Sequence, residues 1–591
     1  IYNERLKPTI SSVQSTLQFG FTEGVSPLIA ALVMSEAAIY AQENNKELYV
    51  ALLDATKAFD VVSHDILFKK LYFSNIDKES WLVTKDWYTD LESAVKWKGL
   101  ISRTFKINQG VRQGGVLSTG FYKLFINDLL LDLEKSGHGL SIGTYYLGCP
   151  TVADDVSLLS LDEFQLQFML DKVWRYAHDH CYGLNASKSM ILMYGAASRL
   201  ESAKSLKTWT LGPDTLPVVK ESVHVGILRN SDRPDLFFED RIKCARRTVY
   251  SLMGAGFHGI NGIKPTVCMT IYKAYVLPIL LYGLETVSIS PKSLEKMNKF
   301  HLSVLKSMQS APLRTSTAAV YLTIGALPIE AYIHKRALNF LGCIFRSHNS
   351  KIRDWSLYMS GTTPYKSSSW FAYISKLLHQ YNLPELVTIY NDPTAKLAWK
   401  NIVSKQVNSF WNAQIIAEVQ LRTSLHFMEV PKDGKPHQVW MSVNNNLKDV
   451  QRAHIKFRLL TGTYLLNERI SMFNKNSTDA KCPLCLTEDE TVAHFLLRCS
   501  ALCEPRSILT QLIRYIIPLM PGRNIQEILS DEPSMLQLII DCSKILPLPQ
   551  KHLNYIELIS RKLCFNLHCR RRFLLNQIQK NTQVKDVVLL N

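Results

Sequence analysis

The stretch Pro150-Thr-Val-Ala-Asp-Asp-Val-Ser-Leu-Leu159 places two adjacent aspartates, Asp154 and Asp155, between apolar residues. A third carboxylate, Asp54, ends the apolar run 48–53. Neighbouring carboxylates repel each other and are costly to desolvate, so a chain tolerates them beside a core when a cation neutralises them. Hard divalent cations such as Mg²⁺ prefer carboxylate oxygens. An Asp-Asp pair alone is also common in solvated turns, and the flanking sequence decides in favour of the metal site.

The flanking pattern predicts a strand–helix–strand–strand–helix–strand order. We expect a strand over 48–53, a helix starting near Ser63, a helix over 118–135, a hairpin over 152–159, a helix around 166–177 and a strand over 189–194. This order is the split βαβ arrangement, in which the end of the first strand and the hairpin tip lie side by side. Asp54 would then meet Asp154, as a two-metal site for nucleotidyl transfer requires.

Composition limits the class of protein. A chain of 591 residues with 47% hydrophobic residues is globular and implies roughly three to five units. Lys and Arg exceed Asp and Glu by 68 − 51 = 17, which favours a polyanionic partner, nucleic acid first and an anionic membrane second. No apolar segment is long enough for a membrane span. Twelve cysteines, most of them isolated in the sequence, are too sparse for a disulfide scaffold and favour a reducing intracellular compartment.

Two longer motifs contain or accompany the aspartates. In Leu53-Asp-Ala-Thr-Lys-Ala-Phe-Asp60, the ring of Phe59 would lie under the sugar of the incoming nucleotide and exclude a 2′-hydroxyl. In Gly110-Val-Arg-Gln-Gly-Gly-Val-Leu-Ser118, glycines would let the backbone approach a base pair, with Arg112, Gln113 and Gly114 contacting nucleotide or template. Taken alone, Phe59 is better explained as a core aromatic. The glycine motif alone is a weak signal, and its alternative is a glycine-rich turn that caps a helix.

Lys188 closes the motif Leu184-Asn-Ala-Ser-Lys188. It would protonate the departing pyrophosphate or stabilise its charge, although a surface lysine before a strand is an equal alternative. The segment His224-Val-Gly-Ile227 would form the hairpin that grips the primer end, with His224 in a structural rather than a catalytic role.

In this order and at these spacings, the motifs resemble the reverse transcriptase of non-LTR (LINE-type) retrotransposons, starting at Gln18-Phe-Gly-Phe21. The resemblance implies an α+β right-hand polymerase, with two Mg²⁺ held by Asp54 and Asp154 and Asp155 assisting. It implies an RNA template, a DNA primer at a nicked target, deoxynucleoside triphosphates as substrates and nuclear action. The upstream fingers strands and an endonuclease are not in the sequence, so we expect an N-terminally truncated chain.

The expected organisation follows from the resemblance and from shifts in pattern along the chain. It comprises partial fingers (1–46), a palm (47–230), a helical thumb (231–348), a helical connecting region (349–475), a zinc knuckle (476–505) and a C-terminal helical region (506–591). The basic stretches 241–247 and 570–572 would contact phosphates, although each is equally a solvated helix face.

The knuckle is predicted from Lys481-Cys-Pro-Leu-Cys485 followed by His494 and Cys499, a C-x2-C-x8-H-x4-C spacing. Cys482, Cys485, His494 and Cys499 would hold one structural Zn²⁺, with Cys503 as a competing fourth ligand. The alternative is a set of unrelated buried thiols. The spacing also resembles the knuckle near the C-terminus of LINE-type polyproteins.

The sequence therefore predicts an RNA-directed DNA polymerase. The alternative is an inactive relic that binds RNA or DNA through its basic thumb and knuckle. Departures from the family pattern at Val152, Thr119 and Glu23, together with the truncated fingers, motivate that alternative. A group II intron or retron-type polymerase is a weaker alternative, because the C-terminal knuckle argues against it.

Overall fold

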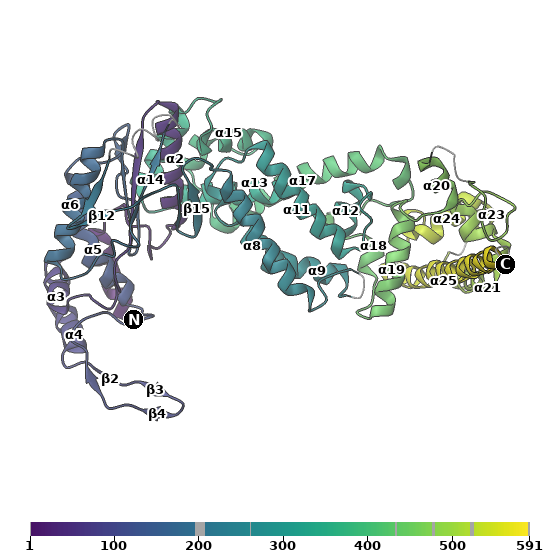
Figure 1. The fold of residues 1–591 in the computed structure, drawn as a ribbon, viewed down its shortest axis with the longest axis horizontal. Coiled ribbons are helices and arrows are strands. Elements are labelled where there is room, and N and C mark those ends of the chain that lie inside the picture. Colours follow the sequence, from purple (N-terminus) through teal and green to yellow (C-terminus); the bar gives the residue numbers. More distant parts are fainter. Residues whose placement is uncertain are drawn as a thin grey trace. The chain divides into compact units, whose positions relative to one another are not determined.

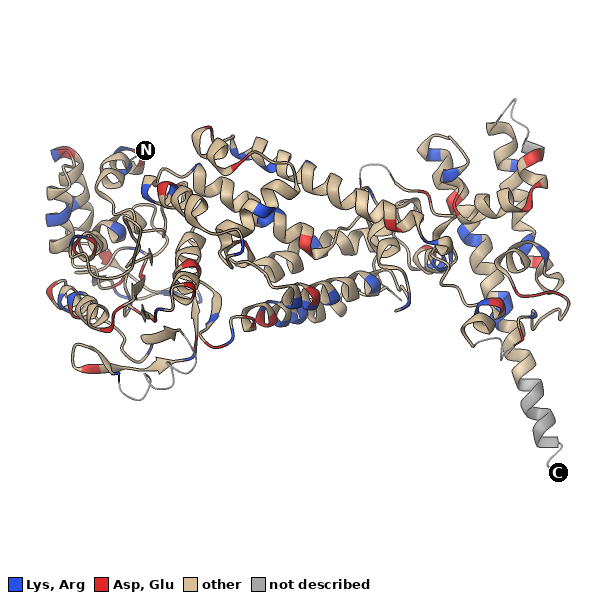
Figure 2. Cartoon of the chain, turned by 90° about the horizontal axis from the view of Figure 1, so that it is seen from above, with Lys and Arg blue, Asp and Glu red and all other residues tan. Residues whose placement is uncertain are grey.

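The computed structural model describes residues 2–195, 207–259, 262–431, 434–474, 479–520 and 525–588. Its contacts divide the chain into two compact units. Unit 1 comprises residues 1–240, 281–293 and 333–406, and unit 2 comprises residues 241–280, 294–332 and 407–591. Charged residues of both signs are interspersed over the helices of both units (Figure 2).

Unit 1 is built around a five-stranded sheet with the order β13-β10-β1-β9-β8. Its strands are β1 (Leu48–Leu53), β8 (Thr151–Val152), β9 (Asp155–Ser160), β10 (Met190–Tyr194) and β13 (Val218–Val219). The central strand β1 pairs antiparallel with both β9 and β10, and all six of its residues are buried. An apolar run without alternation is what a strand covered on both faces requires. The strand order confirms the predicted split βαβ palm.

Helices α3 (His64–Phe73), α5 (Ser118–Lys135) and α6 (Glu163–Asp179) form a connected layer, because α3 packs on α5, α5 on α6, and α6 on β1 and β9. The hydroxyl of Ser63 accepts a hydrogen bond from the Ile66 N–H, which confirms the predicted N-cap. Helix α2 (Leu28–Glu43) packs against β1 and β10 and is buried along most of its first half (Figure 1).

Smaller elements complete the N-terminal part of unit 1. They are α1 (Tyr2–Val13), α4 (Lys78–Tyr88), β2 (Glu92–Ser93), β3 (Lys96–Trp97), β4 (Leu100–Ile101), β5 (Phe105–Lys106), β6 (Ser141–Ile142), β7 (Tyr145–Tyr146), β11 (Trp209–Leu211), β12 (Asp214–Leu216), β14 (Glu221–His224) and β15 (Ile227–Asn230). Strands β2 to β5 form an arm that extends from the body of unit 1 (Figure 1).

The described residues after β15 are mainly helical, as predicted for the thumb and connecting regions. The helices up to residue 420 are α8 (Leu236–Met253), α9 (Pro265–Ile271), α10 (Leu277–Leu281), α11 (Pro291–Met308), α12 (Thr317–Ile324), α13 (Ile329–Phe345), α14 (Ser350–Thr362), α15 (Trp370–Gln380), α16 (Leu386–Asn391) and α17 (Lys396–Gln420). The helices that follow are α18 (Gln438–Met441), α19 (Leu447–Leu460), α20 (Asn467–Phe473), α21 (Cys503–Arg506), α22 (Ile508–Ile516), α23 (Ile525–Ser530), α24 (Glu532–Ile540) and α25 (Gln550–Val588).

The predicted thumb (231–348) and connecting region (349–475) each contribute residues to both units. These functional boundaries remain predictions, and the first residues of the predicted knuckle range 476–505 lie outside the described residues. Within the described part of the chain, no helix is both long enough and apolar enough to cross a membrane.

Candidate active site and metal centre

The end of β1 meets the β8–β9 turn at one edge of the palm sheet. Leu53 pairs with Val156 and Val152 pairs with Asp155, so Asp54 follows β1 next to Asp155 in the antiparallel register. Asp154 lies in the turn itself, directly after Ala153. The topology thus brings together the three carboxylates that the sequence placed at a strand end and a hairpin tip.

The electrostatics of this edge are those of a cation site. Partial desolvation and the nearby charges of Asp154 and Asp54 raise the pKa of Asp155. The neighbouring carboxylates Asp154 and Asp54 therefore disfavour the charge of Asp155, and a hard cation would relieve that repulsion. The donor set fits Mg²⁺, which takes oxygen ligands.

Hydrogen bonds from both backbone groups of Asp54 fix it to the loop that carries Lys188. The Asp54 N–H donates to Ser189 Oγ (3.1 Å), and the Asn185 N–H donates to the Asp54 carbonyl (2.8 Å). Lys188 Nζ lies 4.0 Å from Asp54 Oδ2, with the lysine side chain 69% exposed. The structure therefore places Lys188 at the carboxylate edge, and its role in proton transfer stays a prediction.

The turn that carries Asp154 is held by Gln18, which lies far from it in sequence. Gln18 Nε2 donates to the Ala153 carbonyl (3.2 Å), and the Ala153 N–H donates to Gln18 Oε1 (2.9 Å). Ala153 has φ of +57°, a left-handed conformation that disfavours side chains. Sequence reasoning identified Gln18 only as part of a family motif and missed this positioning role.

Phe59 lies against a second aromatic ring that sequence reasoning also missed. Its ring stacks on Tyr122, with centroids 4.7 Å apart and planes at 17°. Tyr122 is buried, and burial together with the charges of Asp154 and Asp155 holds its pKa well above the ordinary value. The ring of the neutral Tyr122 thus packs against the ring of Phe59 and lies near the aspartate pair. This arrangement suits the predicted exclusion of a 2′-hydroxyl by Phe59.

The loop 110–114 is joined to the Phe59 loop. The Val111 N–H donates to the Phe59 carbonyl (2.8 Å), and Gln113 Nε2 donates to Asp60 Oδ1 (3.1 Å). A Cβ on Gly110 would lie 2.7 Å from the Asp60 carbonyl oxygen, so this close approach requires glycine. Arg112, Gln113 and Gly114 are exposed beside this junction, and their contacts with nucleotide or template stay predictions.

His224 ends β14 and is structural in this fold. It is buried, its Nε2 lies 3.1 Å from Ser157 Oγ, and burial followed by the charge of Arg229 lowers its pKa to about 3. A neutral imidazole that joins the β14–β15 hairpin to β9 agrees with the structural role predicted for it. The primer-gripping role of this hairpin stays a prediction.

In unit 2, Cys482, Cys485, His494 and Cys499 form a possible metal site. Their ligand atoms all lie within 4.8 Å of one another, and among the described residues no other group of three or more such side chains is gathered this closely. Cys482 Sγ lies 3.8 Å from Cys499 Sγ, and Cys485 Sγ lies 3.3 Å from His494 Nε2. A tetrahedral zinc with Zn–S of about 2.3 Å sets two sulfurs about 3.8 Å apart, so the spacing fits.

Carboxylates and an arginine surround this cluster. His494 Nδ1 lies 3.3 Å from Glu488 Oε2, the contact that orients a metal-binding histidine in many sites. Glu490 is buried and accepts two hydrogen bonds from Arg571, at 2.6 and 2.7 Å. Cys503, the competing ligand, is exposed and lies outside the cluster.

Arg571 requires a correction to the predicted phosphate-contacting stretch 570–572. Its side chain is 11% exposed and is engaged by Glu490. The residue therefore holds the knuckle to α25 and is not available to a phosphate. The corresponding prediction for 241–247, on α8, stays a prediction.

Comparison with known proteins identifies the class to which this palm belongs. Residues 1–225 match the family model "Reverse transcriptase (RNA-dependent DNA polymerase)". The chain is 25% identical over 315 residues to a Pol polyprotein of the R2 element of Popillia japonica, covering 51% of this chain and 42% of that protein. It is 27% identical over 290 residues to the RNA-directed DNA polymerase from mobile element jockey of Drosophila melanogaster, covering 48% of this chain and 30% of that protein.

Residues 1–225 are therefore a reverse transcriptase domain. Beyond that domain match, the chain is similar to polyproteins of non-LTR retrotransposons such as R2 and jockey. It spans less than half the length of either relative. Among solved structures, a Candida tropicalis telomerase truncated from its C-terminal domain matches at 15% identity and a TM-score of 0.29, covering 39% of this chain and 43% of that one. The fold assignment rests on the strand order and not on that likeness.

Proposed function

We propose that this chain is an RNA-directed DNA polymerase that extends a DNA 3′-hydroxyl on an RNA template. The observation that carries the proposal is the register that sets Asp54 beside Asp155, with Asp154 in the intervening turn. The reverse transcriptase match over residues 1–225 supports the same reaction. The substrates are deoxynucleoside triphosphates, and by family likeness the primer is a nicked chromosomal target, which implies action in the nucleus.

Each part of the proposed reaction can be assigned to residues of this chain. Asp54 and Asp154 would hold two Mg²⁺, and Asp155 would assist them through its adjoining carboxylate. When bound, the two ions would activate the primer hydroxyl and neutralise the leaving pyrophosphate. Phe59, supported by Tyr122, would exclude nucleotides with a 2′-hydroxyl. Lys188, whose Nζ lies 4.0 Å from Asp54 Oδ2, would protonate the leaving pyrophosphate or stabilise its negative charge.

The four-residue cluster in unit 2 would hold one structural Zn²⁺. Three cysteines and one histidine with closed, mostly buried geometry are the donors of structural sites, in which no position is left open for a substrate. Its contribution would be to fold the knuckle and hold it against α25 through the Glu490–Arg571 pair.

Primer extension on an RNA template, with deoxynucleotides and Mg²⁺, tests the polymerase proposal. Asp154→Asn should abolish extension, because it removes a charged ligand at the carboxylate edge. Asp214→Asn, which neutralises an exposed carboxylate at the start of β12, is the matched control and should extend normally. A folded wild-type chain that does not extend the primer, or an Asp154→Asn variant as active as wild type, would contradict the proposal.

A further inference from the structure

A groove in unit 2 runs between one face of α19 and one face of α25. Its volume is about 590 Å³. Arg458 lines it from α19, while His568, Cys569, Arg572, Phe573 and Asn576 line it from α25. The α25 residues recur at three- and four-residue intervals, so they share one helical face. The palm carboxylates belong to unit 1, whereas every residue that lines the groove belongs to unit 2.

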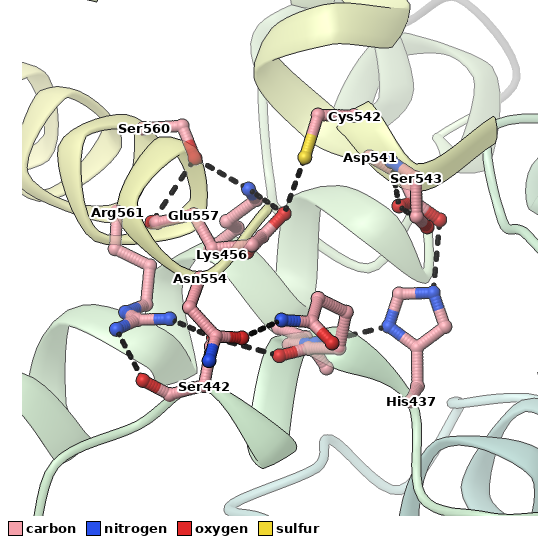
Figure 3. Close-up of polar contacts among 12 residues, drawn as sticks. His437, Ser442, Lys456, Asp541, Cys542, Ser543, Asn554, Glu557, Ser560 and Arg561 are labelled. Carbon is pink, nitrogen blue, oxygen red and sulfur yellow. Dashed lines mark hydrogen bonds and ion pairs between the residues drawn. The ribbon is translucent and has the colours of Figure 1, made fainter. Parts of the chain in front are cut away.

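The two walls of the groove are fixed by buried ion pairs (Figure 3). Lys456 of α19 reaches Glu557 (2.7 Å) and Ser560 (2.5 Å) of α25, and both members of the ion pair are at most 1% exposed. Arg561 of α25 lies 3.1 Å from Asp449 of α19. A ligand that enters the groove would therefore meet preformed walls and would lose little free energy in ordering them.

The groove is strongly cationic. None of its lining residues is an aspartate or glutamate, while Arg458 and Arg572 both face the space. Burial, and then the charges of Arg572, Arg458 and Arg571, lower the pKa of His568 to about 4. Arg458 also has a buried Nε–H with no hydrogen-bond partner among the described residues. These observations point to an anionic ligand. An anion would offset the repulsion between the positive charges of Arg458 and Arg572, and it would accept a hydrogen bond from the unused Nε–H of Arg458.

An aromatic ring and amides narrow the class of anion. Phe573 is 53% exposed beside the arginines, and the Arg570 guanidinium lies 5.9 Å from its ring centre. Gln451 and Asn576 add amide groups to the walls. An inorganic phosphate would use the arginines alone. A chain of phosphates with unpaired bases would also use the ring, on which a base can stack, and the amides, which can donate and accept. The bases of a duplex are stacked on each other and do not offer that face.

We propose that the α19–α25 groove binds single-stranded nucleic acid, with Arg458 and Arg572 on phosphates and Phe573 stacked on a base. Arg571 lies on the same helix but turns to Glu490 of the knuckle. The knuckle is therefore held to the same helix that forms one wall of the groove, and a nucleic-acid strand in the groove would lie along that helix.

The first test measures binding of a fluorescent single-stranded oligonucleotide to the full-length chain by anisotropy, without Mg²⁺ or nucleotides. The Arg458→Gln/Arg572→Gln double variant should bind about tenfold more weakly or worse near 0.1 M salt, because two charge-assisted contacts are lost. Its slope of log K against log salt should fall by about 1.4, at about 0.7 per phosphate contact on a single strand. Phe573→Ala should weaken binding about fivefold or more, with an unchanged slope.

A matched control removes the same charge from the same two helices. Lys448→Gln/Lys551→Gln changes exposed lysines at the start of α19 and of α25 that do not line the groove. This variant should keep the wild-type affinity and nearly all of the salt slope. Thermal unfolding and zinc content, measured on every variant, separate a lost contact from a lost fold.

A second test locates the strand on the protein. Cys569 lines the groove and is exposed, while Cys181 is exposed in unit 1. The oligonucleotide should slow alkylation of Cys569 and leave Cys181 unchanged, and the double arginine variant should lose this protection. Equal alkylation of Cys569 with and without oligonucleotide, or unchanged affinity in the arginine variant, would overturn the proposal. Stronger protection by a duplex of the same sequence would overturn the single-strand assignment. None of these readouts depends on primer extension, so the groove and the polymerase proposals fail separately.

Discussion

The side chain of Gln18 hydrogen-bonds both backbone groups of Ala153, the residue that precedes the aspartate pair. The Gln18 amide nitrogen donates to the Ala153 carbonyl at 3.2 Å, and the Ala153 N–H donates to the Gln18 carbonyl oxygen at 2.9 Å. The Gly20 N–H donates to that same oxygen at 2.8 Å. Gln18 is 1% exposed, so water cannot replace these contacts. A single buried amide therefore fixes the left-handed turn from which Asp154 projects.

Replacing Gln18 should reduce polymerase activity more than it reduces primer–template binding. Gln18→Ala leaves the Ala153 N–H and carbonyl unpaired in a buried turn, which costs on the order of 1–3 kcal/mol per group and lets the turn relax. We expect a tenfold or larger loss in extension rate, since a displacement of about 1 Å at a catalytic group can cost a hundredfold. Gln42→Ala, an exposed change on α2, is the control. Wild-type extension by Gln18→Ala would show that the turn holds its shape without the amide.

Gly20→Ala should disturb the same turn by overpacking. A Cβ at Gly20 would lie 2.2 Å from the Ala153 nitrogen and 2.9 Å from its Cα, and neither backbone atom can move without shifting the turn. We expect a loss of about 1–3 kcal/mol in the free energy of unfolding, together with reduced extension. Gly361→Ala, on α14 with no heavy atom within 4 Å of the new Cβ, should leave both nearly unchanged. Denaturant unfolding of the two variants compares them directly, and equal midpoints would contradict the close approach.

Removing the negative charge of Asp155 should increase the free energy of unfolding, although polymerase activity is lost. Partial desolvation, Asp154 and Asp54 raise the pKa of Asp155. An acid whose pKa is higher in the folded state binds protons more tightly when folded, so its contribution to stability falls as pH rises from the unfolded pKa, about 4, through the raised value. Asp155→Asn removes this penalty. Without divalent ions, we expect a gain of a few tenths to about 1 kcal/mol near pH 7, discounted for solvent screening, and no gain below pH 4.

Thermal unfolding of wild type and Asp155→Asn between pH 3 and pH 8 measures this effect. Added Mg²⁺ should raise the midpoint of the wild type more than that of the variant, because a cation relieves the repulsion only where the charges are present. A variant that is less stable than wild type at pH 7 would show that the Asp155 carboxylate makes net favourable contacts.

The knuckle cluster should bind one zinc per chain through Cys499 and not through Cys503. Cys499 is buried, with its sulfur 3.8 Å from that of Cys482, whereas Cys503 is exposed. Cys499→Ser should therefore lose the metal and lower the thermal midpoint, because a structural zinc contributes to folding directly. Cys503→Ser should retain one equivalent of zinc per chain. Metal analysis of the purified variants decides between them, and retention of zinc by Cys499→Ser would place the fourth ligand elsewhere.

Local sequence predicted those parts of the fold that short segments determine. The apolar run at 48–53, the Asp-Asp turn and the cap at Ser63 each carry their signal within a few residues, and the C-x2-C-x8-H-x4-C spacing carries the metal cluster. The supporting contacts had no such signal. Gln18 and Ala153 are 135 residues apart, and the Arg571–Glu490 pair spans 81. Such pairs depend on the tertiary fold, so charge and composition alone misassigned Arg571 to phosphate binding.

The buried Lys456–Glu557 pair should be far more sensitive to losing one partner than to losing both. Lys456 Nζ lies 2.7 Å from Glu557 Oε1, and the two side chains are 0% and 1% exposed. Lys456→Met leaves the Glu557 carboxylate buried without its cation, which should cost about 3–5 kcal/mol, whereas an apolar pair of similar volume is often neutral or stabilising. We therefore expect Lys456→Met/Glu557→Leu to recover most of the loss. Urea unfolding of the two single variants and the double variant gives the coupling free energy. If the losses in the free energy of unfolding of the two single variants add up in the double variant, each charge is satisfied independently of the other. The ion pair would then not hold α19 to α25.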